Sequence, residues 1–160
     1  MHVLKAKRNA LLIKGKNDMK ITQISVFLEN QPGRLTLAAK TLADANIDIR
    51  TLSLADTSDF GILRLLVDDS ERALAVLEES NFTVKATEVV AVEVPDSPGG
   101  LAKVLNIIAQ TKASIEYMYA YTRPKGENAV MIFCFDNNAE VISFLEKNNL
   151  TLLSNADLKR

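Results

Sequence analysis

The chain has 160 residues, of which 48% are apolar, and a formal net charge of −1 at pH 7. This length suits one ordinary domain or two small ones, and the apolar share is large enough to bury a core, which excludes a disordered or collagen-like chain. The small net charge argues against a broad nucleic-acid surface, because such surfaces need clustered lysine and arginine.

The first 20 residues differ from the rest of the chain in charge. They hold six basic side chains against one acidic side chain, Asp18, so the remainder is acidic. Their longest apolar run, residues 10–13, is too short for a signal peptide or a membrane span. We expect residues 1–20 to be a basic N-terminal extension outside the fold. A disordered tail and a nucleic-acid-binding arm are both open for it.

Residues 21–88 contain six elements in the order βαββαβ. A β-rich run at residues 21–29 (ITQISVFLE) ends at a Pro-Gly bend, and helical spacing begins after Arg34. Strand-like runs follow at residues 47–55 and 62–67, a second helix begins near Ser70, and FTVKATE forms the last strand. The apolar face of the first helix is expected to hold Leu35, Ala38, Ala39, Leu42 and Ala45.

The same order returns in residues 89–154. Pro32-Gly33 and Pro98-Gly99 lie 66 residues apart, and beyond Thr122 the offset becomes 68 because the hairpin at residues 122–128 is longer. We therefore predict an α+β fold of two ferredoxin-like βαββαβ repeats, each an antiparallel sheet with helices on one face. The expected domains are residues 21–88 and 89–154, and residues 155–160 form a C-terminal tail.

The two bends, ENQPGRL and VPDSPGGL, have the same outline. The first N–H groups of a helix lack intrahelical partners and carry partial positive charge, so an anion can bind there. Proline is well suited to the first helical turn, and glycine allows close approach of a ligand or backbone. The Gly99-Gly100 pair leaves the second bend bare. The simpler alternative is that both bends only turn a strand into a helix.

With these paired bends on βαββαβ repeats, residues 21 to about 154 resemble ACT domains, which are small-molecule sensing modules of amino-acid metabolism. The resemblance implies that a free amino acid sits between two adjoining domains, held by the bend of one and the start of the second strand of the other. The first bend is most similar to the serine-sensing domain of 3-phosphoglycerate dehydrogenase, whose ligand-holding asparagine matches Asn30. In that domain a second ligand-holding asparagine opens the second strand, and the matching residues of this chain are Asp48 in the first repeat and Ser114 in the second. A histidine two residues before the bend asparagine is replaced by Leu28 and by Val94.

The resemblance implies two unlike sites. In one, the Asn30 bend faces Ser114; in the other, the Asp96 bend faces Asp48, and its two carboxylates favour a cationic group, so we expect it to bind first. The predicted ligand-binding residues are Asn30, Gln31, Pro32, Gly33, Arg34, Leu35, Asp48, Ile49, Asp96, Ser97, Pro98, Gly99, Gly100, Leu101, Ser114 and Ile115.

Other reactive residues do not form a catalytic arrangement. The lone Cys134, within MIFCF, excludes a disulfide framework inside one chain and is expected in the core, and the single histidine, His2, excludes a histidine-rich metal site or a triad. The acidic pair Asp68-Asp69 is expected to be solvated.

Three tyrosines at alternate positions share one sheet face. If Leu52 and Leu54 point to the core, these tyrosines point away from the helices, where a subunit interface, an exposed strand and a ligand contact are alternatives. They are Tyr117, Tyr119 and Tyr121.

We therefore expect a cytoplasmic, non-catalytic amino-acid-binding regulatory protein without a cofactor or metal. It is expected to form a homodimer, to act on a regulated enzyme or other protein partner, and to contact no membrane; nucleic acid is not expected as a partner. The alternative is a transcriptional regulator similar to the two-ACT glycine-cleavage repressor, acting through a partner or the basic extension.

Overall fold

The computed structural model describes residues 19–56, 60–121 and 128–158. The N-terminal extension up to residue 18, the tip of the first hairpin and the longer second hairpin, with Arg123 and Lys125, lie outside the described residues. The chain divides into two compact units, residues 22–87 and residues 88–160 with the segment up to Ile21, and each is described by itself.

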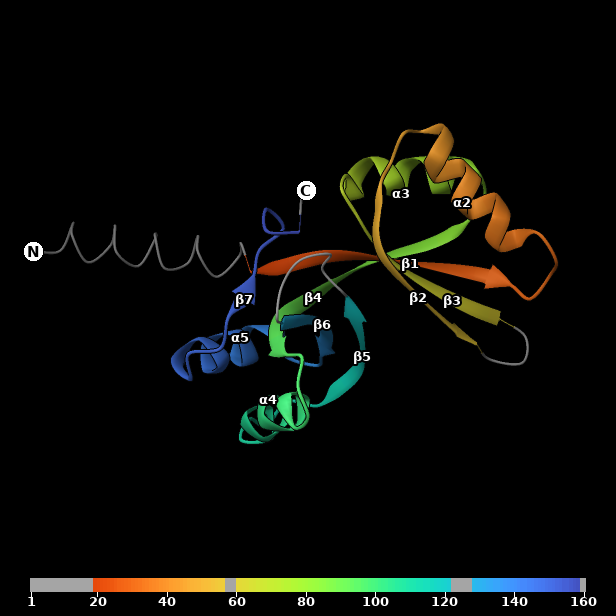
Figure 1. The fold of residues 1–160 in the computed structure, drawn as a ribbon. Helices are drawn as coiled ribbons and strands as arrows, with labels where there is room; N and C mark the ends of the chain where they lie inside the picture. The colour runs from red at the N-terminus through yellow and green to blue at the C-terminus, as the bar shows by residue number, and fades with distance from the viewer. Residues whose placement is uncertain (1–18, 57–59, 122–127, 159–160) are drawn as a thin grey trace, which may run out of the picture. The chain divides into compact units, whose positions relative to one another are not determined.

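The unit of residues 22–87 has the expected six elements. Their order is β1 (Lys20–Glu29), α2 (Arg34–Asp44), β2 (Ile49–Asp56), β3 (Phe60–Val67), α3 (Ser70–Glu79) and the first part of β4 (Thr83–Pro95). The strand order is β2-β3-β1-β4, with β3 antiparallel to both β1 and β2. Both helices lie on one face of this sheet (Figure 1), as a ferredoxin-like fold requires.

The core of this unit lies between the sheet and the two helices. Alternate residues of β1 and β3 point into it, as the period of two predicts. The buried set is Ile24, Val26, Leu28, Ala38, Leu42, Ile47, Leu63, Leu65, Ala73, Leu77 and Phe82. The expected face of α2 is wrong in part, because Leu35 is 44% exposed and Ala39 is exposed as well.

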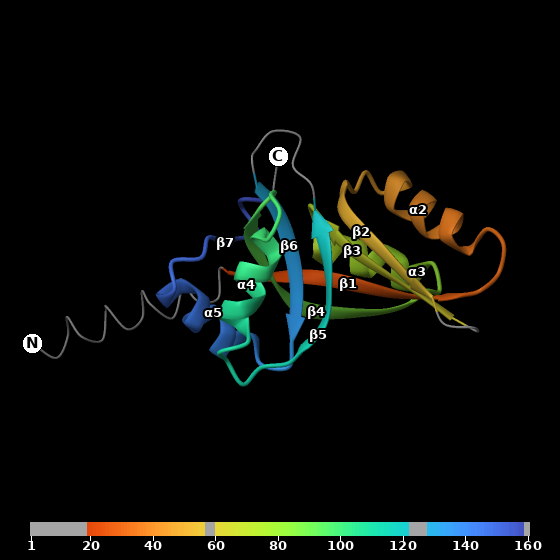
Figure 2. The same ribbon diagram turned by 60° about the horizontal axis from the view of Figure 1, so that its bottom comes forward.

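The second unit repeats the arrangement with its last strand shortened. It continues from β4 through α4 (Gly100–Ile108), β5 (Ile115–Tyr121), β6 (Asn128–Phe135), α5 (Asn138–Lys147) and β7 (Leu152–Leu153). The strand order is β7-β4-β6-β5. Both helices lie beside each other against one face of the strands (Figure 2). The predicted α+β fold with two βαββαβ repeats is confirmed.

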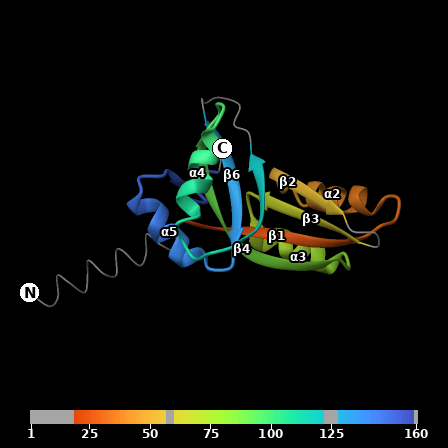
Figure 3. The same cartoon turned by 90° about the horizontal axis from the view of Figure 1, so that it is seen from below.

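Three details differ from the expected boundaries. The first strand begins at Lys20, so the expected extension of residues 1–20 reaches into the fold. The last strand of the first repeat and the first strand of the second are one continuous strand, β4 (Figure 3). The segment after residue 154 is more than a tail, because Asp157 accepts hydrogen bonds from the N–H and hydroxyl of Ser154 at 2.7 Å each and Leu158 is 6% exposed. Burial of Leu158 gives this turn an apolar contact that a free tail would lack.

The three tyrosines of β5 lie on the sheet face away from the helices. Tyr119 is paired with Ile132, whereas its neighbour Met118 is paired with Phe133, a member of the helix-side core. Paired residues on adjacent strands share a face, so this expectation is confirmed. In the first repeat, Leu52 and Leu54 correspond to Met118 and Ala120. They share the helix side with Leu65 and Leu63, but they are 53% and 49% exposed instead of buried.

Candidate ligand-binding site

Both Pro-Gly bends have the same backbone conformation. Gly33 and Gly99 have φ values of 85° and 84°, a left-handed region that residues with a Cβ rarely occupy. Each is the N-cap of the helix that follows, and neither helix has a side-chain cap. The prolines therefore lie in the turn before each helix, and the expectation that they occupy its first turn is wrong.

The first turn of each helix leaves backbone donors unused. The N–H of Arg34 donates to the carbonyl of Gln31 at 3.3 Å, and that of Gly100 donates to the carbonyl of Ser97 at 2.9 Å. Within the described ranges, the next two N–H groups of each helix, those of Leu35, Thr36, Leu101 and Ala102, have no hydrogen-bond partner. Such groups can bind a carboxylate at a helix N-terminus.

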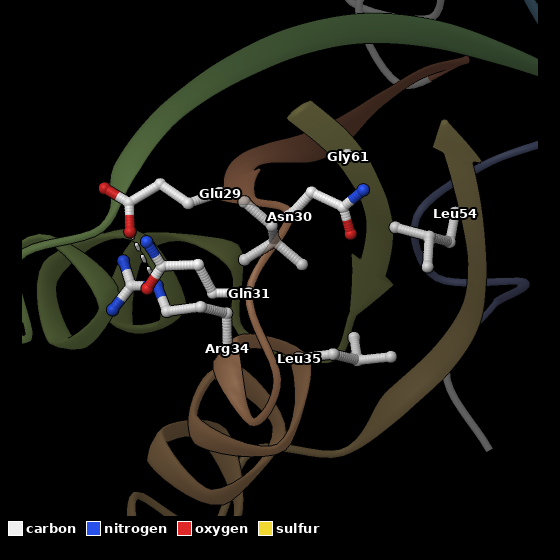
Figure 4. Close-up of a pocket in the computed structure, with 8 residues that line it drawn as sticks. Glu29, Asn30, Gln31, Arg34, Leu35, Leu54 and Gly61 are labelled. Carbon is white, nitrogen blue, oxygen red and sulfur yellow. Dashed lines mark ion pairs between the residues drawn. The ribbon is translucent and has the colours of Figure 1, made fainter. Parts of the chain in front are cut away.

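The first bend borders a pocket of about 210 Å³. Its polar lining comes from the bend and its apolar lining from three leucines on β1, α2 and β2 (Figure 4). The lining residues are Leu28, Glu29, Asn30, Gln31, Arg34, Leu35, Leu54 and Gly61. Four predicted site residues, Asn30, Gln31, Arg34 and Leu35, are thus brought together, whereas Pro32 and Gly33 shape the bend without lining the pocket.

Arg34 is held in place by two contacts. Its Nε lies 3.4 Å from Oε2 of Glu29, across the bend, and its guanidinium lies 4.6 Å from the centroid of the Phe82 ring. Glu29 is well exposed, so the ion pair itself contributes little stability, about 0–1 kcal/mol. The contacts orient the guanidinium and balance its charge beside the pocket.

The second bend is built differently at the same two positions. Pro95 and Gly100 replace Glu29 and Arg34, and a Cβ added to Gly100 would overlap the carbonyl group of Pro95. Gly100 is also buried. The expectation that the Gly99-Gly100 pair leaves this bend bare is wrong at Gly100, where the backbone of Pro95 fills the space, whereas a Cβ at Gly99 would meet no atom within 4 Å. Asp96, Ser97, Pro98, Gly99 and Leu101 are exposed around it.

The starts of the two second strands share another arrangement. The N–H of Asp48 donates to Oδ1 of Asp68, and the N–H of Ser114 donates to Oδ1 of Asp136, both at 3.0 Å. Asp68 is therefore not merely solvated. The carboxylate of Asp48 lies 2.8 Å from Nη1 of Arg50, so its charge is already balanced. This ion pair weakens the argument for a cation-favouring site at Asp48.

Within one repeat, the bend and the start of the second strand lie at opposite ends of the sheet. On β3, Val67 is paired with Ile49 and Phe60 with Glu29, and the strand between them spans about 23 Å. A ligand at the Asn30 bend cannot also reach Asp48 of the same repeat. Ile49 and Ile115, two predicted site residues, instead pack against the cores of their own units.

The family model of an ACT domain pair matches residues 19–160. The chain belongs to the ACT family. This confirms the resemblance inferred from the paired bends.

Solved structures of other proteins give the same fold. Protein BT0572 from Bacteroides thetaiotaomicron is 37% identical over 89% of this chain and 97% of its own, with a TM-score of 0.83. The ligand-free regulatory subunit of aspartate kinase from Thermus thermophilus is 21% identical over 81% of this chain and 93% of its own, with a TM-score of 0.58. The Thermus flavus subunit is 20% identical over the same shares, with a TM-score of 0.57. Among curated proteins, none matches.

Four residues that line the pocket of the first ACT repeat were missing from the predicted set: Leu28 and Glu29, next to the bend in sequence, and Leu54 and Gly61. Leu54 and Gly61 come from β2 and β3, far from the bend in sequence. The alignment of the repeats contains a signal for Leu54 and Gly61, because both positions differ in side-chain size between the repeats. Leu54 corresponds to the smaller Ala120, and Gly61 corresponds to the larger Ala129. Only the pairing of Gly61 with Leu28 places them beside the bend.

The described part of this ACT chain gives no evidence for a metal centre or a membrane span. In residues 19–56, 60–121 and 128–158, no three His, Cys, Asp or Glu side chains are grouped to hold a metal ion. None of the helices described is long and apolar enough to cross a bilayer. Cys134 is buried, as expected, and its thiol lies 3.4 Å from Oε2 of Glu116.

Proposed function

We propose that this ACT domain pair is a non-catalytic regulatory protein that binds a free amino acid at the bend of the first repeat. The observation that carries the proposal is the pocket beside the Asn30 bend, where polar side chains meet a helix N-terminus with unused N–H groups. The N–H groups suit the ligand carboxylate, and the amide oxygens of Asn30 and Gln31 suit its ammonium.

The mechanism we propose is linkage. Because Asn30 and Asp48 lie at opposite ends of one sheet, a ligand at the bend needs residues from another ACT repeat to close the site. A ligand that touches two repeats stabilises one arrangement of them, and a partner that prefers this arrangement is regulated. The pairing of the Asn30 bend with Ser114, and of the Asp96 bend with Asp48, stays a prediction.

The setting of this function is also part of the proposal. A single free cysteine suits a reducing cytoplasm. A homodimer is supported by the edge strand β2, which carries the exposed Leu52 outside the pocket. A regulated enzyme as partner is supported by the likeness to an aspartate kinase regulatory subunit, which is a likeness of fold.

Thermal unfolding of the full chain with each of the twenty amino acids tests the proposal. A ligand at one hundred times its dissociation constant stabilises the fold by about 2.7 kcal/mol, so binding gives a clear rise in Tm. The rise should be lost in Asn30→Ala and kept in Asn106→Ala, a control on the exposed surface of α4. No rise with any amino acid would contradict the proposal.

A further inference from the structure

Resting on the proposed function, we propose that the pocket at the first bend selects an amino acid with an aliphatic side chain, and that Leu35 and Leu54 form the wall that contacts it. The ligand's carboxylate and ammonium would lie at the bend, and its side chain would extend toward β2.

The apolar wall of the pocket is accessible to a ligand. Leu35 is 44% exposed and Leu54 is 49% exposed, while Leu28, which also lines the pocket, is buried at 4%. Both exposed side chains lie on the same side of the pocket, away from the Glu29–Arg34 pair (Figure 4). An aliphatic group placed there removes apolar surface from water on both partners, which is the main favourable term for such a contact.

The charged groups of the pocket do not favour a charged ligand side chain. Glu29 and Arg34 are its two ionisable lining residues, and they are paired with each other. A cationic or anionic side chain would have to compete with that pair and would leave the leucines exposed. The uncharged polar groups, Asn30 and Gln31, lie at the bend, where they are matched to the backbone groups of an amino acid.

Gly61 makes room for Leu54. A Cβ added to Gly61 would lie 3.3 Å from Cδ1 of Leu54. Any larger residue at position 61 would therefore restrict the space that the Leu54 side chain occupies. In the second repeat the corresponding residues are Ala120 and Ala129, and Ala129 is paired with Val94 as Gly61 is with Leu28. Leu54 and Gly61 therefore give the pocket of the first repeat a large apolar wall, which the two alanines of the second repeat cannot form.

The volume limits the size of the side chain. At about 210 Å³ the pocket is smaller than the roughly 300–1,000 Å³ of sites for drug-sized ligands. A branched or linear aliphatic chain of three or four carbons fits this class of site. We therefore expect affinity to rise from alanine to valine to leucine or isoleucine, by about fourfold for each buried methylene group.

Isothermal titration of the full chain with leucine, isoleucine, valine, alanine, serine, aspartate and lysine tests this inference. The first three should bind more tightly than alanine, and the last three should bind at least tenfold more weakly than leucine. Tight binding of serine, aspartate or lysine that Asn30→Ala abolishes would overturn the aliphatic preference while leaving the proposed function intact. Binding of none of the seven overturns the inference; the panel of twenty then decides the proposed function by itself.

Three variants locate the side-chain contact. Leu54→Ser should weaken leucine binding by tenfold or more and alanine binding by less than threefold, and the matched change in the second repeat, Ala120→Ser, should leave both unchanged. Gly61→Ala displaces the mobile end of Leu54 and should weaken leucine more than alanine. Circular dichroism and sedimentation of each variant serve as controls for folding and assembly. Equal weakening of leucine and alanine by Leu54→Ser, with or without a change in sedimentation, would overturn the assignment of Leu54 to the ligand's side chain.

Discussion

Gly100 lies against the backbone of Pro95 so closely that a Cβ at residue 100 would overlap the Pro95 carbonyl group. At the equivalent positions of the first repeat, Glu29 and Arg34 form an ion pair across the bend. The same turn is therefore closed by backbone contact in one repeat and by long charged side chains in the other. This difference gives the two bends different surroundings although their glycines share one conformation.

Gly100→Ala should destabilise the second unit by about 1–3 kcal/mol, because the Pro95 backbone has to move. The adjacent Gly99→Ala is a matched comparison, since its added Cβ meets no atom within 4 Å and only the left-handed φ is penalised, at about 1–2 kcal/mol. Urea unfolding measures both. A Gly100→Ala protein as stable as wild type would show that the bend can relax without cost, contrary to this prediction.

Asp68→Ala and Asp136→Ala should each destabilise the chain by about 1 kcal/mol. Each substitution removes the carboxylate that accepts the N–H of Asp48 or Ser114 at the start of a second strand. Asp68→Asn and Asp136→Asn keep an acceptor oxygen and should recover most of the loss. Denaturant unfolding gives the free energies, and amide exchange should become faster at Asp48 or Ser114 only in the alanine variant. Equal stability of the alanine and asparagine variants would contradict the role of the acceptor.

Asp69→Ala and Asn137→Ala should each lower the free energy of unfolding by about 1 kcal/mol. Both residues are N-caps: Oδ1 of Asp69 accepts the N–H of Arg72, and Oδ1 of Asn137 accepts the N–H of Glu140. Exchanging the two cap types, as Asp69→Asn and Asn137→Asp, should change stability by less than half as much. The thermal midpoint of each variant checks that the alanine variants are less stable than the exchanged-cap variants. A cap that contributed only by its charge would not produce this order.

Asn81→Ala should destabilise the first unit by about 1 kcal/mol, because this residue follows the C-cap of α3 and has a φ of 60°. Asn81→Gly should be neutral or stabilising, since glycine adopts that conformation freely. Asn149, with φ of 59° after α5, offers the same pair of substitutions in the other unit. Thermal unfolding of the four variants measures the difference, and an alanine variant matching its glycine counterpart would refute the prediction.

The fold could be predicted from the sequence because the strand period of two and the helical period both occur twice along the chain, at matching positions of the two repeats. Alternation in β1 and β3 buried Ile24, Val26, Leu63 and Leu65 as a period of two requires. The helical period failed at Leu35, which it assigned to the core. Ala38 and Leu42 of the same helix are buried, whereas Leu35 is 44% exposed and lines the pocket instead.

The sequence by itself determined the repeat, the fold, the family and the residues of the bend, because each depends on local spacing or on an outline that recurs along the chain. Only the tertiary structure decided what surrounds each bend. The pairing of Leu28 with Gly61 brings Leu54 to Asn30, and the Pro95 backbone fills the space at Gly100. These contacts join residues far apart in sequence or depend on backbone separation, and neither strand register nor close approach is encoded in a local pattern.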